Sequence, residues 1–185
     1  AQGDNRIQTN QLTNSGTISS NGQDNATTIN TTAVHNSGTI SAQGNTQIQS
    51  SAELQNSGTV AAGRELKVNA QTIDNSNGVL NGQRLDITTN SINNTKGKIQ
   101  QTGATQALSL NAGSLSNVNG GLVGYEPIEA STGGGSTGGS TGGTGAIDVP
   151  TTAAGGGTSA VVQPTPLPEL GNGVINVTGN VLNDA

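Results

Sequence analysis

A five-residue motif, Asn-Ser-Gly-Thr-Ile, stands at residues 36–40 and returns in near-copies along the chain. Closely similar segments occupy 14–18 and 56–60, and looser ones occupy 75–80 and 94–99. Self-similarity with a period of about 20 residues is typical of a solenoid, in which one supersecondary unit is repeated and stacked. Each unit contacts mainly its neighbours, so stability is shared along the stack. The repeat therefore predicts a solenoid.

Each repeat carries three aliphatic anchors at set distances from a turn asparagine. The turn asparagines, spaced by 19 to 23 residues, are Asn14, Asn36, Asn56, Asn75, Asn94 and Asn117. Seven or eight positions before them stand Ile7, Ile29, Ile48, Val68, Ile87 and Leu110. Two positions before them stand Leu12, Val34, Leu54, Ile73, Ile92 and Leu115. Four or five positions after them stand Ile18, Ile40, Val60, Leu80, Ile99 and Leu122.

Around the anchors the sequence alternates between apolar and polar residues, as at 66–68 and 85–87. Alternation with a period of two predicts short strands with one buried face. Asn, Ser, Thr and Gly recur so often that helix is disfavoured. We therefore expect an all-β fold, a parallel β-helix with three short strands in each coil of about 20 residues. Equivalent anchors should stack, and six coils should extend roughly 30 Å.

The Asn-Ser-Gly segment is typical of a corner between two strands. Asn tolerates the left-handed backbone conformation and Gly adopts it without steric cost, so we expect that conformation here. Stacked Asn side chains can also hydrogen-bond from coil to coil as a ladder. After the corner, Thr39 should face outward and Ile40 inward. Gly comes later in the last three copies, which predicts a wider turn there. A second set of corners is expected at Gly22, Gly44, Gly63, Gly82 and Gly103.

Composition limits both the core and the chemistry of the chain. Its 185 residues include no Cys, Met, Trp or Phe and a single Tyr, and charged residues make up 9%. Without Cys there is no disulfide, zinc thiolate or thiol nucleophile. The net charge of −5 and the pI near 4.5 disfavour nucleic acid as a partner. An Asn- and Gln-rich disordered chain is the alternative, but three aliphatic registers over six periods favour a fold.

The periodic pattern stops near residue 124 and returns at residue 173, which divides the chain into three parts. We expect β-helix coils over 1–124, one long inserted loop over 125–172, and a resumed coil over 173–185. The loop is rich in Gly, Ser, Thr and Pro, a composition typical of flexible and extended chain.

The loop has two interpretations. It could be a recognition element on a rigid scaffold, where binding loops tend to lie, or an insertion without a partner. Its candidate receptor contacts are Tyr125, Glu126 and Pro127, because few other loop residues have side chains suited to binding.

The repeats resemble those of the filamentous haemagglutinin family, the exoproteins of bacterial two-partner secretion. Residues 63–75 match one family repeat nearly in full, and the resemblance covers about 1–124 and 171–185. The family includes large adhesins and the exoproteins of contact-dependent growth inhibition, which carry a toxin on a long stalk. The resemblance implies a right-handed β-helical fibre and export through an outer-membrane transporter of a two-partner system. It also implies a secreted or cell-surface location.

The function expected from this resemblance is that of a structural and adhesive shaft, which presents distal adhesin or toxin modules. One alternative is a segment that binds a cell-surface receptor or glycan through the 125–172 loop. A second alternative is a β-helical enzyme acting on polysaccharide, since some such enzymes are parallel β-helices.

Catalysis would need clustered charged residues on one face of the coils. Glu65, Lys67 and Asp86 fall near one strand face, with Arg64 and Arg84 close by. A catalytic carboxylate pair needs about 5–10 Å between its members, which adjacent coils could supply. These charges alternate with the core anchors, however, as on any solvated face. We therefore expect no enzyme, no catalytic residue, no metal and no cofactor.

The single histidine and four Asn-X-Thr sequons are the remaining candidate site residues. His35 is the single histidine and precedes a corner asparagine, so we expect an exposed polar residue. Four Asn-X-Thr sequons are candidate glycosylation sites. Their asparagines are Asn25, Asn30, Asn93 and Asn176.

Overall fold

The computed structural model describes residues 3–103, 108–125 and 174–183, which form fourteen strands and no helix. The first five strands are β1 (Asn5–Gln8), β2 (Gln11–Asn14), β3 (Thr17–Ser20), β4 (Thr27–Asn36) and β5 (Thr39–Ala42). The next five are β6 (Thr46–Asn56), β7 (Thr59–Asn69), β8 (Thr72–Asp74), β9 (Val79–Asn93) and β10 (Lys98–Gln101). The last four are β11 (Ser109–Asn117), β12 (Leu122–Tyr125), β13 (Val174–Val177) and β14 (Val181–Asn183).

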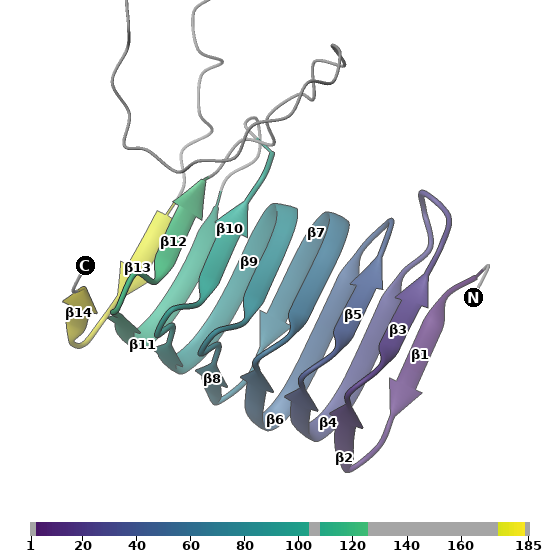
Figure 1. The fold of residues 1–185 in the computed structure, drawn as a ribbon, viewed down its shortest axis with the longest axis horizontal. Coiled ribbons are helices and arrows are strands. Elements are labelled where there is room, and N and C mark those ends of the chain that lie inside the picture. Colours follow the sequence, from purple (N-terminus) through teal and green to yellow (C-terminus); the bar gives the residue numbers. More distant parts are fainter. Residues whose placement is uncertain (1–2, 104–107, 126–173, 184–185) are drawn as a thin grey trace, which may run out of the picture. The chain divides into compact units, whose positions relative to one another are not determined.

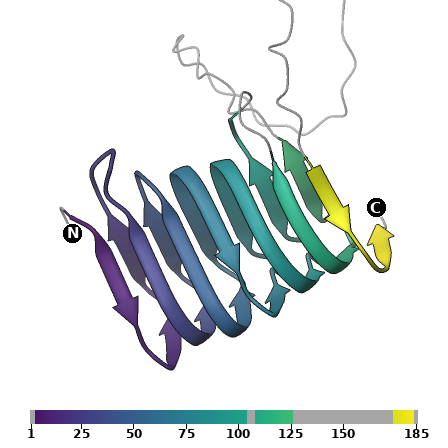
Figure 2. The same cartoon turned by 180° about the vertical axis from the view of Figure 1, so that it is seen from behind.

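All pairings between these strands are parallel and join one coil to the next, as Figures 1 and 2 show. The result is a β-solenoid of about six coils, each of about 20 residues, as the repeat predicted. Every complete coil contributes to three faces, named here by their anchors. The first face holds Ile29 opposite Ile48, and the second holds Val34 opposite Leu54. The third face holds Ile40 opposite Val60.

The core is a column of aliphatic side chains that runs through the middle of the coils. Ile29, Ile48, Leu54, Leu80 and Ile87 are fully buried. Anchors of the first coil (Ile7, Leu12 and Ile18) are only partly buried. The difference arises because, within the described residues, a first-coil anchor has a neighbouring coil on one side only. Burial therefore depends on stacking, which agrees with the expected inward orientation of the anchors.

Strands run through two of the five corners that the glycines were expected to mark. Within the described residues only the first coil has three separate short strands, whereas β7 passes Gly63 and β9 passes Gly82 without interruption. The β7–β9 register shifts between Ala62 and Glu65, so the corner is a bend with a bulge rather than a break. Neighbouring coils on both sides continue the hydrogen bonding, which lets the strand turn and remain a strand.

The left-handed backbone expected at Asn-Ser-Gly is absent from those corners of the described chain. The non-glycine residues with positive φ are instead Asn77, Lys96 and Asn119, with φ of 60°, 54° and 55°. All three lie in the later turns, where Gly comes later in the sequence. Each of these longer turns thus contains one residue in the left-handed conformation, which is common at turn positions.

Glycine is needed in the Asn-Ser-Gly corners for a different reason. A Cβ added to Gly58 would overlap the carbonyl oxygen of Gly38 in the preceding coil. The backbones of successive corners therefore stack too closely for any side chain. Gly16 has no such neighbour, since nothing lies within 4 Å of a Cβ built on it.

One expected anchor is wrong by one residue. Val123, not Leu122, lies opposite Ile99 and packs against the core, while Leu122 lies opposite Lys98. The turn that follows Asn117 is wider than its predecessors, so the inward position moves one residue along the chain.

Residues 174–183 add two more strands to the stack. Both β13 and β14 pair with β11, so Ile175 lies opposite Leu110 and Val181 opposite Leu115. The segment 126–173, which holds nearly all of the expected loop, lies outside the described residues.

Candidate functional site

The turn asparagines form a continuous ladder along the coils. Each side-chain Nδ2 donates to the Oδ1 of the asparagine in the next coil, at 2.7 to 2.8 Å. Each Nδ2 up to Asn117 also lies 2.9 to 3.2 Å from a glycine carbonyl oxygen of its own turn. From Asn14 to Asn117 these asparagines are at most 8% exposed. The ladder is thus confirmed, and its polar atoms are occupied by the protein itself.

The charged residues near Glu65 are brought together as two ion pairs between coils. Arg84 Nη1 lies 3.1 Å from Glu65 Oε1, and Lys67 Nζ lies 2.9 Å from Asp86 Oδ2. The hydrogen bond to Asp86, with the attraction of its charge, raises the pKa of Lys67 above 10.5. A lysine held in its charged form is poorly suited to act as a base. Each carboxylate of the group faces a cation, which is the arrangement of a surface ion pair.

Arg64 belongs to neither of these two pairs. Its Nη2 is 2.7 Å from Asp24 Oδ1, and both side chains are largely exposed. Pairs of this kind contribute about 0–1 kcal/mol to stability. The five charged residues of the enzyme hypothesis are thus near one another, but all of them are engaged with partners of opposite charge.

His35 has a partner that the sequence did not indicate. Its Nε2 lies 3.0 Å from Glu53 Oε1, and Glu53 Oε2 accepts a hydrogen bond from Gln55 Nε2 at 3.1 Å. His35 and Glu53 are 18 residues apart, close to one repeat period, and that spacing was the available signal. Across residues 3–103, 108–125 and 174–183, no group of three or more His, Cys, Asp or Glu side chains could hold a metal ion. Within the same ranges there is no helix long and apolar enough to cross a membrane.

The four sequon asparagines lie in different surroundings. Asn30 and Asn176 are exposed on the first face. Asn25 is partly buried and donates to the carbonyl oxygen of Asn21 at 2.6 Å. Asn93 is exposed, but its Oδ1 accepts from Thr95 Oγ1 at 2.7 Å. On accessibility, Asn30 and Asn176 are the better placed of the four for modification.

Of the candidate receptor contacts, one lies within the described part of the chain. Tyr125 ends β12, is partly buried and lies opposite Gln101 of β10. Glu126 and Pro127 lie outside the described residues. The loop hypothesis therefore rests on its sequence alone.

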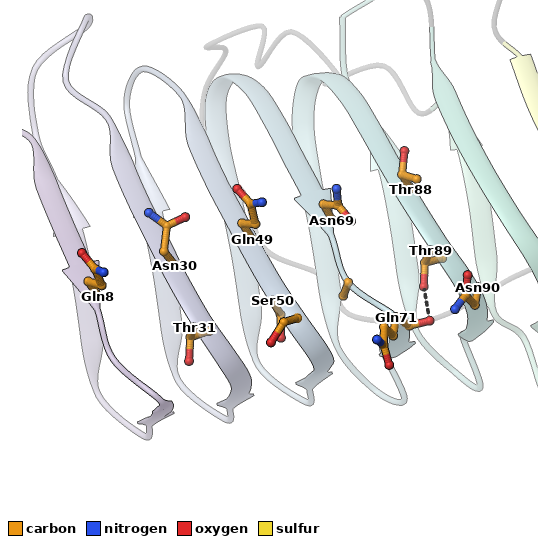
Figure 3. A pocket seen from close by; sticks show the side chains of 12 residues that line it. Gln8, Asn30, Thr31, Gln49, Ser50, Asn69, Gln71, Thr88, Thr89 and Asn90 are labelled. Carbon is orange, nitrogen blue, oxygen red and sulfur yellow. Dashed lines mark hydrogen bonds between the residues drawn. The ribbon is translucent and has the colours of Figure 1, made fainter.

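A surface hollow lies at the corner between the first and second faces, and is called here the amide groove. Its volume is about 640 Å³. Figure 3 shows one row of its side chains, which follow each other from coil to coil: Gln8, Asn30, Gln49, Asn69 and Thr88. Sequence reasoning missed it, although each of these residues directly follows a first-face anchor.

Comparisons of this chain with models of protein families, with curated proteins and with solved structures found no match. The resemblance of the repeats to filamentous haemagglutinin therefore stays a prediction.

Proposed function

We propose that the chain is a shaft segment of a secreted or surface-exposed bacterial exoprotein. On this proposal it presents distal adhesin or toxin modules away from the cell and contributes no catalysis. The parent protein would reach the exterior through an outer-membrane transporter of a two-partner system, as the repeat resemblance implies. The observation that carries the proposal is the uninterrupted asparagine ladder. Each coil added to the stack would supply one more asparagine to bond to the last, so the ladder can continue to any length.

Stiffness would come from three sources that repeat in every coil. Backbone hydrogen bonds join equivalent strands, aliphatic anchors stack in the core, and the ladder fills the interior of the turn. Because a coil contacts mainly its neighbours, the length of the shaft would scale with the number of coils. Cross-coil ion pairs such as Lys67–Asp86 tie the outer surface in the same direction.

Changing the length of the stack tests this proposal. Deleting residues 57–75 removes one whole period and joins Asn56 to Ser76, so the turn remains Asn-Ser-Asn-Gly. We expect that variant to fold and to shorten by about 4.8 Å, measured by small-angle scattering. The matched control deletes 57–66, which is half a period, and should unfold because it shifts anchors out of register. Equal tolerance of both deletions would contradict a stack held by register.

A second arm asks whether this segment contacts cells through its inserted loop. Labelled 1–185 is compared with a version in which 126–170 is replaced by a short turn, on bacterial and epithelial cells. For a shaft, whatever binding occurs should be the same for both forms. Loss of binding in the shortened form would assign receptor recognition to the loop. Release of reducing or unsaturated sugar ends from a polysaccharide would instead favour an enzyme.

A further inference from the structure

The amide groove crosses five successive coils on one side of the stack. Its lining comes from β1, β4, β6, β7 and β9 and from the residues that join the first and second faces. Neighbouring strands in a sheet lie about 4.8 Å apart, so the four steps from Gln8 to Thr88 span roughly 19 Å. The groove therefore runs along the stacking direction, and equivalent side chains return at every coil (Figure 3).

Two kinds of polar side chain line the groove, and they differ in their hydrogen bonding. The hydroxyls at its base are engaged: Ser50 Oγ donates to the carbonyl of Thr32 at 2.6 Å, and Thr89 Oγ1 to that of Gln71 at 3.1 Å. The outward amides of Gln49 and Asn69, by contrast, have no side-chain partner among the described residues. Among the described residues, the other exposed amide side chains of the groove also have no hydrogen-bond partner. They are those of Gln8, Asn30, Gln71 and Asn90.

The groove amides differ from the turn asparagines, which bond to each other from coil to coil. Stacked amides one coil apart can bond to each other, as Asn56 and Asn75 do. The groove amides are equally stacked, with Gln49 opposite Asn69, yet they leave their donors and acceptors facing the hollow. The groove therefore offers a regular series of unpaired amide groups.

The lining also limits which ligand would fit. It contains no ionisable residue, and its one aliphatic side chain is that of Ala70. An anionic polymer such as nucleic acid would find no cation there, and an apolar peptide would find no pocket for its side chains. Strand addition needs an open sheet edge. The lining strands β4, β6, β7 and β9 are paired on both sides, and β1, at one end of the groove, has the single open edge among the described lining strands.

We propose that the amide groove binds a neutral, extended oligosaccharide that lies along the stack and crosses the coils. Its ring hydroxyls would exchange hydrogen bonds with the outward amides, which carry both donors and acceptors. A linear chain of linked sugar rings presents hydroxyls at intervals close to the spacing of the coils, so successive rings can meet successive coils. The proposal goes beyond the role of a shaft, and either can fail without the other.

Titration of isotope-labelled 1–185 with neutral oligosaccharides, followed by nuclear magnetic resonance, tests this. The probes are β-1,4-linked glucose and N-acetylglucosamine oligomers and α-1,4-linked glucose oligomers, each from one to six units. We expect the side-chain amide signals of Gln49 and Asn69 to shift, and affinity to rise with the number of units. A heparin fragment of similar length serves as the charged comparison and should leave these signals in place.

A double variant, Gln49→Ala with Asn69→Ala, should weaken binding about tenfold, since each lost hydrogen bond is worth a modest amount. The matched control is Asn81→Ala with Gln100→Ala, which removes two outward amides of the third face. It should bind as the unchanged chain does, and circular dichroism shows whether both variants remain folded.

Three outcomes would overturn the proposal. The first is that no neutral oligomer shifts the groove signals, and the second is that heparin shifts them more than the neutral series does. The third is equal loss of affinity in the groove variant and the third-face control. A length-dependent shift that only the groove variant weakens would support it.

Discussion

Asn56 donates its side-chain amide to the Oδ1 of Asn75 at 2.7 Å, and the two residues are 2% and 0% exposed. They are 19 residues apart in sequence, one coil apart in space, and each is bonded in the same way to its other neighbour. An interior made of small aliphatic side chains thus includes a continuous polar column. That column satisfies buried amides whose unpaired burial would be costly.

Replacing Asn75 with Leu should break this column at its middle. The Oδ1 of Asn94 would lose its donor inside the turn. The Nδ2 of Asn56 would lose Asn75 but keep the carbonyl oxygens of Gly58 and Val79. Each unsatisfied buried group costs about 1–3 kcal/mol, so we expect a clear fall in the free energy of unfolding, measured by urea and circular dichroism. Asn81→Ala, at a partly exposed outward position, is the control and should stay within about 0.5 kcal/mol of the unchanged chain. Similar losses for both would show that the ladder adds no stability.

Gly58→Ala should destabilise the stack because its Cβ would overlap the carbonyl oxygen of Gly38. Overpacking of this kind costs about 1–3 kcal/mol. Gly16→Ala makes the same change at the equivalent corner of the first coil, where nothing lies within 4 Å. We expect that variant to have a melting temperature near that of the unchanged chain. If the two variants melt together, close stacking of the corners does not explain these glycines.

Core substitutions should cost more in the middle of the stack than in its last described coil. Ile87 is fully buried, so Ile87→Ala should lower the free energy of unfolding by about 2–5 kcal/mol. Ile87→Asp should prevent folding, since it buries an unpaired charge. Ile175 has the same place in its coil but is 48% exposed, and Ile175→Ala should cost much less. Urea unfolding of the three variants measures this, and equal losses for the two alanine variants would contradict it.

The Lys67–Asp86 pair should stabilise the chain at neutral pH and lose that effect in strong base. Its hydrogen bond and charge raise the pKa of Lys67 above 10.5, so folding favours the charged lysine. The contribution is therefore complete below pH 10.5 and is lost as the pH rises through the raised pKa. Since the lysine side chain is 51% exposed, the effect should be at most about 1 kcal/mol.

The variant Lys67→Met tests the sign of this effect. Urea titrations of the variant and of the unchanged chain are made well below pH 10.5 and again above pH 10.5. The variant should have the lower unfolding free energy at the lower pH, and the difference should shrink at the higher pH. Lys98→Met is the control, because Lys98 makes no ion pair in the described part of the chain. A deficit for Lys67→Met that grows with pH would show that the pair acts in the opposite sense.

Much of the fold could be predicted because the repeat constrains every coil in the same way. A chain with Ile29, Ile48, Val68 and Ile87 at one register can bury them together only by stacking parallel coils. The same logic predicted the asparagine ladder, since an asparagine at the same position in every coil stacks on the asparagine of the next coil. For a solenoid, sequence period and spatial neighbourhood are nearly the same information.

Departures came where local geometry depends on the neighbouring coil. The Asn-Ser-Gly corner was expected to need a left-handed residue, but Gly58 is required by the closeness of Gly38. Val123, not Leu122, is the anchor because the turn after Asn117 is wider than the earlier turns, and the repeat did not indicate this additional width. The pairing of His35 with Glu53 joins different positions of two coils, so alignment of like positions did not reveal it.

By itself, the sequence determined the fold class, the length of the coil and the residues that face inward, because hydrophobic period alone specifies these. Only the tertiary structure decided what the outward side chains do. It placed His35 beside Glu53, and it left Gln49 and Asn69 unpaired along a hollow. The reason is physical. Inward side chains have one environment, the core, which the period fixes. Outward side chains can interact with water, with their own coil or with the next coil. Which of these occurs depends on how each corner bends.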